Sequence, residues 1–461
     1  MNKMLVFALA FAIIFSQSLM LSALAAPPSK SRGTAREIPP PTPGRGRTVM
    51  APGLQGALGM GGDGMNYTAS VVRAPGGEKL AGLKKAVDAK VLTAYNAFGF
   101  NILAEIRKAD PGANVFISGF SIMQALSMTY NGVDGGPKND MAKTLCVEGI
   151  SDEALNGSNM ALRNLVSALD NKVILNVANS LWANTNVTFE KSFIEANKNA
   201  FDAEVANLDF NSPDAAKKIN AWVKRKTADR ISQVIGETSA RTMMILVNAI
   251  YFKGSWSTRF DKTKTRDADF GAAGGKKSKV KMMEQNGNYL YQQCDKFQAV
   301  SLPYGDGNLS MTVFLPSKNS SLDDFMKGVN AESYAGWMKS FTERPGAYKM
   351  PRFRMEYSST LNAILGGLGM ASSFSPTSAN FSRMCKGVRD ICISLVVHKT
   401  FVEVNEEGTE AAAVTAVVTE SRSIREPEEP FEMIVDRPFF FTIHDNVSGT
   451  VLFMGAINDL K

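Results

Sequence analysis

Two histidines and four cysteines are the residues of this 461-residue chain best suited to general-base chemistry or to binding a transition metal. His398 and His444 are too few for a histidine-rich zinc site, and no Cys-x-x-Cys pair could supply thiolates. The sequence also lacks a Walker phosphate loop, a Gly-x-Gly-x-x-Gly after a strand-like run and a Gly-x-Ser-x-Gly elbow. A histidine-dependent hydrolase would have to use one of these two histidines. The residues therefore disfavour an enzyme, and we expect no metal and no cofactor.

The segment 405–423 has the pattern most suggestive of a function. Gly408 can supply a backbone hinge that other residues would resist. Residues 409–419 are small or β-branched apart from Glu410, so nothing bulky prevents them from entering a sheet. Side chains of an extended chain alternate between two faces, so Glu410 and Glu420 share one face, and the odd-numbered residues of 409–419 form an uncharged one. That face could be buried in a sheet; a surface strand or a flexible loop is the alternative.

Around this segment the sequence strongly resembles the serpins, the serine-protease-inhibitor family. Residues 401–413 are similar to the serpin hinge, whose positions are held here by Glu407, Gly408, Thr409, Glu410, Ala411, Ala412 and Ala413. Motifs similar to a buried helix, a central-sheet strand and the closing C-terminal strands of the family are found at 116–130, 246–256, 438–441 and 452–455. Gly119 departs from the pattern, because the family usually has proline there. The ordered motifs cover nearly all of the region 80–461.

The resemblance implies an α+β protein with the serpin fold: a large mixed central β-sheet, two smaller sheets, about eight or nine helices and an exposed reactive-centre loop at about 405–430. The hydrophobic patterns also indicate an α+β protein. They predict helices at 80–107, 120–130, 152–169, 190–202, 213–231 and 321–341. Runs of β-branched and aromatic residues predict strands at 172–183, 243–252, 299–302, 311–315, 393–404, 439–443 and 451–457.

The resemblance also implies a mechanism. A serine protease attacks a peptide bond of the exposed loop and forms an acyl-enzyme, and the cut loop then inserts into the large sheet as a new strand. In serpins the bond typically follows the residue fourteen positions after the hinge glycine, which is Arg422 here, followed by Ser423. Fourteen extended residues span roughly 46 Å, enough to cross a long sheet. An arginine at this position implies trypsin-like targets, and Arg425–Glu426 is the less favoured alternative bond.

Residues outside the loop match structural positions of the family. Ser118, Ser121, Asn248 and His398 match the shutter, a buried hydrogen-bond network that governs strand separation. For His398, a satisfied histidine beneath a sheet describes nearly the same arrangement. Trp256 matches a tryptophan in the breach, the top of the sheet where insertion starts, and an ordinary core aromatic is the alternative.

The first 25 residues look like a cleavable secretory signal peptide. Lys3 precedes an apolar run, and residues 23–25, Ala-Leu-Ala, provide a small-residue exit. A membrane anchor is disfavoured because residues 16–18 interrupt the run short of the roughly 20 residues that a spanning helix needs. Residues 26–79 are rich in Pro, Gly, Arg and Ser, which predicts a disordered extension. We therefore expect a secreted, extracellular protein with one folded domain at 80–461.

Secretion would permit disulfides and glycans. Cys385 and Cys392 are close enough in sequence to close a small loop, and two unpaired thiols are an equally good interpretation. Seven N-x-S/T sequons, among them Asn156, Asn186 and Asn308, fit a secreted glycoprotein.

The charge distribution gives little support for an anionic partner. Residues 1–80 hold eight Lys/Arg and three Asp/Glu of a chain with net charge +7, which leaves the remainder at only +2 and argues against nucleic acid. The basic residues of 213–231 fit the solvent face of an amphipathic helix better than a polyanion site. The lysines of 276–281 look like the protected edge of a hairpin. Heparin-binding serpins carry a basic helix near 151–171, but this segment is acidic, so glycosaminoglycan binding is unsupported.

We therefore expect a monomeric inhibitor that forms a covalent complex with a trypsin-like serine protease and binds neither nucleic acid nor membrane. A non-inhibitory serpin, serving as a carrier, chaperone or storage protein, is the alternative. Such members often have bulky or charged residues where insertion needs small ones, whereas this chain has Thr-Glu-Ala-Ala-Ala at 409–413. The hinge composition therefore favours inhibition.

Overall fold

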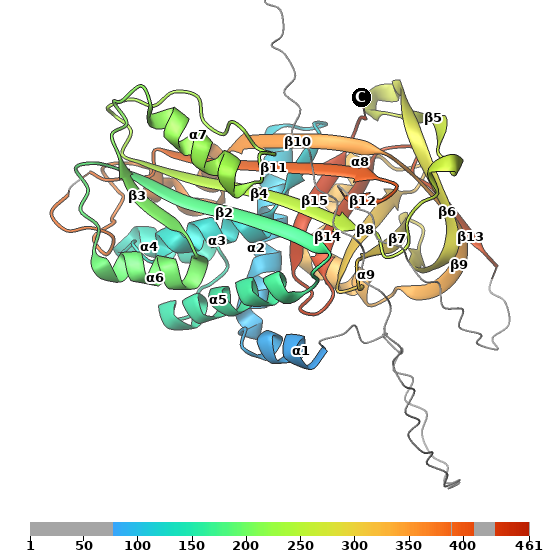
Figure 1. Ribbon diagram of the computed structural model, residues 1–461, viewed down its shortest axis with the longest axis horizontal. Coiled ribbons are helices and arrows are strands. Elements are labelled where there is room, and N and C mark those ends of the chain that lie inside the picture. Colours follow the sequence, from blue (N-terminus) through green and yellow to red (C-terminus); the bar gives the residue numbers. More distant parts are fainter. Residues whose placement is uncertain (1–76, 389, 410–428, 461) are drawn as a thin grey trace, which may run out of the picture. The chain divides into compact units, whose positions relative to one another are not determined.

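The computed structural model describes residues 77–388, 390–409 and 429–460, in which helices and strands are mixed along the chain (Figure 1). The α-helices of these residues are α1 (Gly77–Lys85), α2 (Ala89–Ala109), α3 (Gly119–Tyr130), α4 (Gly135–Thr144), α5 (Asp152–Ala168), α6 (Lys191–Phe201), α7 (Ala215–Lys226), α8 (Leu322–Lys327), α9 (Ala331–Met338) and α10 (Asn362–Leu365). The strands are β1 (Val115–Ile117), β2 (Val173–Asn184), β3 (Glu204–Leu208), β4 (Met244–Ser255), β5 (Arg266–Gly271), β6 (Lys277–Gln293), β7 (Phe297–Tyr304), β8 (Leu309–Pro316), β9 (Thr342–Pro351), β10 (Phe353–Thr360), β11 (Leu395–Asn405), β12 (Gly408–Thr409), β13 (Phe431–Ile434), β14 (Phe439–Asp445) and β15 (Val451–Ile457). A 3₁₀ turn, η1 (Lys262–Lys264), precedes β5.

The large mixed sheet predicted from the sequence is confirmed. It has six strands in the order β10-β11-β12-β4-β2-β3, with parallel pairing between β11 and β4 and between β2 and β3. The two faces of β4 enter different cores, because successive side chains of a strand point in opposite directions. Leu246 and Ile250 belong to the main core, whereas Val247 and Tyr251 belong to a second core beneath α7. In Figure 1, α7 lies on one side of this sheet and α2 to α6 lie on the other.

The remaining strands form a single nine-stranded sheet rather than the two smaller sheets expected. Its order is β1-β15-β14-β8-β7-β6-β9-β13, and β5 pairs with β6. The 17-residue strand β6 makes the connection, because it pairs with β5 at its start, with β9 in its middle and with β7 at its end. The C-terminal strands β14 and β15 are buried along their whole length.

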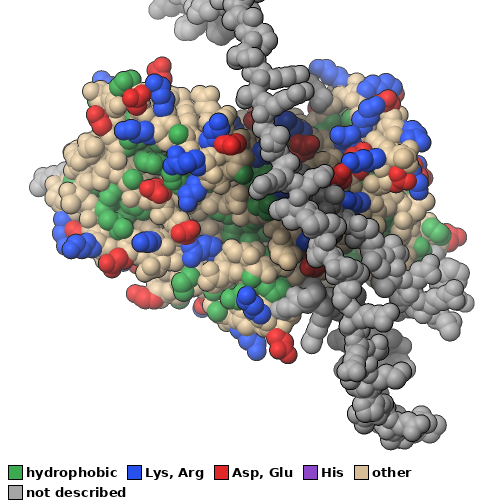
Figure 2. Space-filling model, viewed as in Figure 1, with side chains coloured by type: hydrophobic (Ala, Val, Ile, Leu, Met, Phe, Trp, Pro, Cys, Tyr) green, Lys and Arg blue, Asp and Glu red, His purple; other side chains and the backbone are tan. Residues whose placement is uncertain are grey.

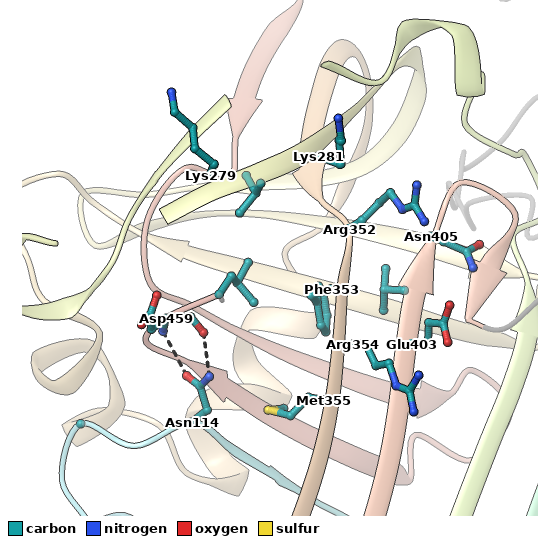
Figure 3. A pocket seen from close by; sticks show the side chains of 14 residues that line it. Asn114, Lys279, Lys281, Arg352, Phe353, Arg354, Met355, Glu403, Asn405 and Asp459 are labelled. Carbon is teal, nitrogen blue, oxygen red and sulfur yellow. Dashed lines mark hydrogen bonds between the residues drawn. The ribbon is translucent and has the colours of Figure 1, made fainter. Parts of the chain in front are cut away.

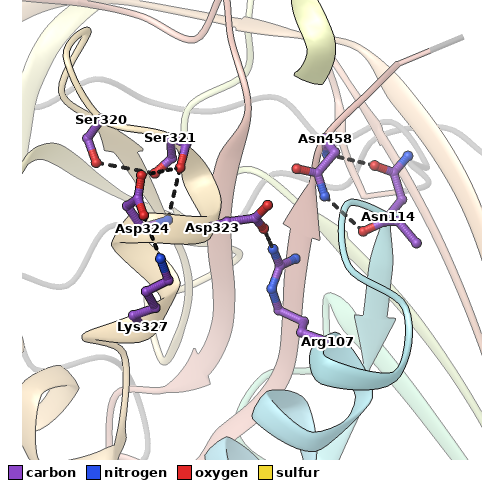
Figure 4. Close-up of polar contacts among 9 residues, drawn as sticks. Arg107, Asn114, Ser320, Ser321, Asp323, Asp324, Lys327 and Asn458 are labelled. Atoms are coloured by element: carbon purple, nitrogen blue, oxygen red, sulfur yellow. Dashed lines mark hydrogen bonds and ion pairs between the residues drawn. The ribbon is translucent and has the colours of Figure 1, made fainter.

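The helix expected at 80–107 is divided into α1 and α2. Asp88 interrupts it, because its extended backbone and its carboxylate, which accepts a 2.8 Å hydrogen bond from the N–H of Lys90, start a new helix. Near the end of α2, Arg107 forms an ion pair with Asp323 of α8 (Figure 4). This ion pair ties α2 to α8.

The helix expected at 321–341 is likewise two helices. The Ser321 hydroxyl caps α8, and Gly328 ends it (Figure 4). Asn330 and Ser333 then form a reciprocal capping box that starts α9. The hydrophobic pattern runs through the interruption, whereas the capping residues determine where each helix begins. The helix expected at 213–231 is shorter than predicted, and its buried residues include Ile219, Trp222 and Val223, as the amphipathic pattern indicates.

All four cysteines lie in the described residues and are free thiols, so Cys385 and Cys392 do not form the small disulfide loop that the sequence left open. Burial raises the pKa of both thiols above the ordinary value, which keeps them protonated and unreactive. Within the residues that the structure describes, no helix combines the length and the apolar character needed to cross a bilayer.

The three named sequons differ in accessibility. Asn186 is exposed. The Asn308 side chain is buried and donates a 2.6 Å hydrogen bond to the Leu169 carbonyl, and the Asn156 amide bonds to Asn131. Of these three, Asn186 therefore offers the most accessible amide for a glycan.

Candidate functional site

The candidate site lies where β11 and β4 separate in the six-stranded sheet. Over seven residues, Leu395–Phe401 of β11 pairs in parallel with Ile245–Tyr251 of β4, and we call this stretch the seam. Beyond the seam the space between the two strands holds β12, which pairs antiparallel with both of them. We call this space the slot. The sheet therefore has a closed seam followed by a slot that contains the start of one additional strand.

Gly408 begins the strand in the slot, and its position requires glycine. Its φ of 145° lies in a region that favours residues without a side chain. A Cβ atom at this position would lie 2.1 Å from the carbonyl oxygen of Gly254 and 2.6 Å from the Cα of Ser255. Any other residue would therefore push the hinge away from β4.

Thr409 fills the slot and points into the main core. It is fully buried, and its hydroxyl lies 2.8 Å from the hydroxyl of Tyr304. Tyr304 stacks on Trp256 with ring centroids 4.5 Å apart and meets Phe252 edge-on at 5.1 Å. Burial raises the pKa of Tyr304 far above its ordinary value, so the phenol stays protonated. Aromatic rings thus line the slot, and the Tyr304 hydroxyl has its hydrogen-bond partner in the small side chain of Thr409.

Two glutamates form the turn that joins β11 to β12, and both have cationic neighbours. Glu407 pairs with Lys262, whose hydrogen bond holds the pKa of that carboxyl below its ordinary value. Glu406 is almost fully buried. Its carboxylate accepts a 2.7 Å hydrogen bond from the hydroxyl of Thr265 and lies 3.6 Å from Nε of Arg352. The turn is therefore held by charge on both sides.

The backbone of the turn is also bonded to the segment after β4. The N–H of Trp256 donates to the carbonyl of Glu407 at 3.0 Å, and the N–H of Phe260 donates to the carbonyl of Glu406 at 2.9 Å. The indole Nε1 of Trp256 donates to the carbonyl of Asn405 at 2.9 Å. The structure thus places Trp256, which the sequence associated with the start of insertion, directly against the hinge.

Lower in the seam, the four residues matched to the shutter form one buried network together with Asn179. The N–H of Ser118 donates to Nε2 of His398 at 3.1 Å, and Nδ1 of His398 lies 2.5 Å from Oδ1 of Asn248. The Asn248 amide donates to Oδ1 of Asn179 at 2.6 Å and to the backbone oxygen of Ser121 at 3.0 Å. Because His398 is on β11 and Asn248 is its register partner on β4, the network crosses the seam.

The hydrogen bonds assign the protonation state of His398. Since Nε2 accepts from the backbone of Ser118, the neutral ring carries its proton on Nδ1 and donates it to Asn248. Burial lowers the pKa of His398 from 6.5 to about 3. The ring is therefore neutral at physiological pH, and a second proton would place a donor where the network needs an acceptor.

The rest of the predicted site lies outside the described residues. This applies to the hinge residues Glu410, Ala411, Ala412 and Ala413 and to the bond between Arg422 and Ser423. Among the residues that the structure does describe, no group of three His, Cys, Asp or Glu side chains is arranged to hold a metal ion. Of the residues expected at the site, the structure therefore describes Glu407, Gly408, Thr409 and Trp256 around the slot, and the network of Ser118, Ser121, Asn248 and His398.

Comparison with known proteins places this arrangement in a family. Residues 93–460 match the sequence profile of the family described as serpin (serine protease inhibitor). The chain belongs to the serpin family. This serpin is 34% identical over 381 residues to an uncharacterized serpin-like protein of Thermococcus kodakarensis, a match that covers 82% of this chain and 88% of that protein.

A human relative and a solved structure agree with this assignment. The serpin is 35% identical over 380 residues to human leukocyte elastase inhibitor, covering 79% of this chain and 98% of the relative. The crystal structure of the thermophilic serpin tengpin in its native state matches with a TM-score of 0.74 and 29% identity, over 81% of this chain and 95% of tengpin. The serpin fold predicted from the sequence is confirmed.

Several residues of the serpin's site were not identified from the sequence. Tyr304, Lys262 and Arg352 come from segments far from the hinge and have no spacing that connects them to it. Asn179 did carry a signal, because it is a polar residue in the middle of the apolar strand-like run 172–183. A buried polar residue needs a partner, and such a residue in a central strand could have been assigned to a network.

Proposed function

We propose that this serpin is a secreted inhibitor of trypsin-like serine proteases. A target protease cleaves the reactive-centre loop after Arg422 and is held as an acyl-enzyme when the loop inserts between β4 and β11. The slot carries the proposal, because Gly408 and Thr409 already pair with both strands there. The relative named leukocyte elastase inhibitor supports an inhibitory role, and the leader at 1–25 supports secretion.

Insertion replaces one ladder of hydrogen bonds by two. The seven parallel pairs of the seam are lost, and the new strand pairs antiparallel on both sides, as β12 already does. If residues 410–422 continue this register, the exchange gains on the order of ten hydrogen bonds, or on the order of 10 kcal/mol at about 1 kcal/mol each. The alternation that directs Thr409 to the core would direct Ala411, Ala413 and Thr415 there as well. All three are small enough for such a face.

The intact loop cannot make this move, because both of its ends are fixed. Thr409 pairs in one sheet and Phe431 in the other, and 21 residues join them. Insertion of 410–422 would carry Arg422 roughly 43 Å along the sheet, whereas the eight residues 423–430 reach at most about 29 Å. In Figure 1 the seam runs away from β13. The uncut chain would therefore keep residues 410–422, which we call the arm, from inserting. Cleavage is therefore the trigger.

The chemistry of the cut is supplied by the protease. Its serine hydroxyl attacks the carbonyl carbon of Arg422, an ester forms, and the amide bond breaks with release of the Ser423 amine. The serpin contributes the guanidinium that an acidic specificity pocket binds and the sheet that receives the arm. Movement of the arm displaces the attached protease and distorts its active site before water hydrolyses the ester.

The test is to mix the protein with trypsin and to separate the products after boiling in SDS. We expect a covalent complex of the combined mass, and mass spectrometry should find a released peptide that begins at Ser423. Clean cleavage at this bond without a complex would support a non-inhibitory serpin. A released peptide that begins at Glu426 would move the reactive bond to Arg425.

A further inference from the structure

The strands β6, β9 and β13 have one buried face and one exposed face. Tyr291, Tyr348 and Met433, one from each strand, belong to the main core. Because side chains alternate along a strand, their neighbours in the chain point away from that core. Leu290 of β6 is a large apolar side chain that is 51% exposed, and its register partner on β9, Glu343, is exposed as well. We call the exposed side of these three strands the outer face.

The outer face carries more negative than positive charge. Lys349 of β9 lies 3.6 Å from the carboxylate of Glu284 on β6 and 3.9 Å from that of Glu432 on β13. One lysine is thus shared by two glutamates, and Glu343 adds a third carboxylate. The Glu284 and Glu432 side chains remain 38% and 62% exposed, so their ion pairs with Lys349 are weak and an incoming cation can compete for them. Three carboxylates against one ammonium group leave the outer face negative.

The charge of β6 changes sign along its length. Residues 259–281, which include η1, β5 and the start of β6, hold eight Lys/Arg and three Asp/Glu. Figure 2 shows Lys and Arg side chains gathered over this part of the surface, at the upper right. In Figure 3, Lys279 and Lys281 project from β6 beside Arg352. A cationic partner is therefore repelled by the start of β6 and attracted to the outer face.

The reactive-centre loop returns to the fold at the edge of the outer face. The described part of the chain resumes at Glu429, whose carbonyl accepts a 2.9 Å hydrogen bond from Nη2 of Arg344 on β9. The guanidinium of Arg344 lies over the ring of Tyr291, 5.3 Å from its centroid, and that ring stacks on Phe431 with centroids 3.9 Å apart. The position of Glu429 is therefore fixed against β6 and β9, next to the outer face.

A protease bound at Arg422 is large enough to reach the outer face. Arg422 is seven residues before Glu429, so the two Cα atoms are at most about 25 Å apart. A protease of roughly 220 residues has a radius of gyration of about 17 Å, which corresponds to a diameter of roughly 40 Å. Charges act over about 30 Å at low salt. The rim of a protease whose cleft holds Arg422 therefore comes within the range of the carboxylates of the outer face.

We propose that the outer face is a second contact surface for the target protease and selects a protease with lysine or arginine side chains on the rim of its cleft. The proposal rests on the proposed function, because the loop is what brings the protease to this end of the molecule. Complementary charge beside the loop steers the protease and raises its rate of association more than it tightens the complex. Leu290 offers an apolar contact within the same surface. The outer face thus adds selection by charge to selection by arginine.

The experiment measures the rate constant for association of the full-length protein with cationic trypsin at about 0.02 M and about 1 M salt, together with the stoichiometry of inhibition. Glu343→Gln/Glu432→Gln should associate about three- to tenfold more slowly at low salt, and the difference should vanish at about 1 M, where the screening length is about 3 Å. The stoichiometry should stay the same, because the hinge and the slot are unchanged. Glu195→Gln/Glu204→Gln is the matched control: it removes the same charge on α6 and β3, on the other side of the molecule in Figure 1, and should associate at the natural rate.

Two further measurements separate selection by charge from inhibition. Anionic trypsin binds the same arginine but carries the opposite net charge, so the Glu343→Gln/Glu432→Gln variant should associate with it faster than the natural protein does. Trypsin whose catalytic serine is replaced by alanine binds the loop without cutting it. Its equilibrium affinity therefore tests the outer face without requiring a covalent complex, and we expect this affinity to fall in the same variant.

Several outcomes would overturn the proposal. An unchanged rate of association for Glu343→Gln/Glu432→Gln, or an equal loss in Glu195→Gln/Glu204→Gln, would refute the role of the outer face while the proposed inhibition stands. A higher stoichiometry at an unchanged rate would also refute it, because the substitutions would then act on insertion. Dimers of the natural protein that dissociate in the variant would assign the face to a second copy of the chain. Absence of an SDS-stable complex, with affinity for the inactive trypsin still reduced in the variant, would refute the inhibition and support the outer face.

Discussion

Replacement of Thr409 by arginine tests the slot most directly. Thr409 is fully buried against the phenol of Tyr304, so an arginine there must either bury an unpaired charge or hold the hinge out of the sheet. Burial of an unpaired charge costs several kcal/mol, and loss of the hydrogen bond to Tyr304 adds about 1–3 kcal/mol. If about 3 kcal/mol of this total appears in the barrier to insertion, insertion slows roughly 100-fold. The acyl-enzyme would then be hydrolysed before the arm is in place.

The assay is the stoichiometry of inhibition of trypsin, measured together with cleavage of the loop. We expect the Thr409→Arg variant to be cleaved after Arg422 as fast as the natural protein, while the stoichiometry rises more than about tenfold. Glu410→Arg is the matched control, because alternation assigns this position to the opposite face of the strand. An unchanged stoichiometry in Thr409→Arg, or an equal rise in Glu410→Arg, would refute the reasoning about the buried face.

Three further predictions concern the reactive bond, the stability gained on cleavage and the dependence of stability on pH. Arg422→Ala should abolish the SDS-stable complex with trypsin, and a complex of undiminished yield would exclude Arg422 as the reactive residue. Cleavage should raise the melting temperature by on the order of 10 °C or more, because about 10 kcal/mol of ladder bonding is gained, and calorimetry showing equal values would contradict insertion. The folded pKa of His398 is about 3 against 6.5 when unfolded, so its contribution is complete above pH 6.5 and is lost as pH falls towards 3. The loss is about 2 kcal/mol by pH 5, and a urea midpoint that does not fall between pH 7.5 and 5 would contradict it.

The fold was largely predictable wherever a segment is apolar on at least one face. The strand-like runs at 172–183, 243–252 and 393–404 correspond to β2, β4 and β11, and all are central strands of the six-stranded sheet. The strands β9 and β10 were not predicted. Exposed polar residues and a Pro-Gly pair obscure the pattern of β9. In β10 the alternation of Phe353, Met355 and Tyr357 with polar residues is present, but it extends over only a few residues. The number of sheets could not be read from the sequence either, since it depends on the long pairing of β6 with three partners.

The start of the hinge, Trp256 and the network around His398 could be assigned from the sequence, whereas the other side chains that contact the hinge could not. The need for glycine at 408 and the inward direction of Thr409 follow from local backbone geometry and alternation. Tyr304 and Lys262, by contrast, are 105 and 145 residues from their hinge partners. Their side chains carry no local pattern, so only the folded structure brings them to the slot.

The register of β12 makes a last prediction about the shutter. Thr409 opposes Val404 on β11 and Gly254 on β4, so an antiparallel strand that continues without a bulge places Thr415 opposite both His398 and Asn248. These two side chains share a hydrogen bond across the closed seam, and insertion must separate them. In this inserted register, alternation would direct the Thr415 hydroxyl to the core face, where it could accept from Nδ1 of His398 and donate to Asn248.

If so, the arm restores the bonds that it breaks, and the shutter delays insertion without weakening the inserted form. Thr415→Val keeps the shape but leaves buried polar groups unpaired, at a cost of about 1–3 kcal/mol in the cleaved protein. The cleaved variant should therefore melt a few degrees lower than the cleaved natural protein, whereas Ala416→Ser, on the opposite face, should have little effect. Equal melting of cleaved Thr415→Val and cleaved natural protein would show that the arm does not continue the register of β12. Gly408 and Thr409, the two residues already in the slot, would then not set the register of residues 410–422.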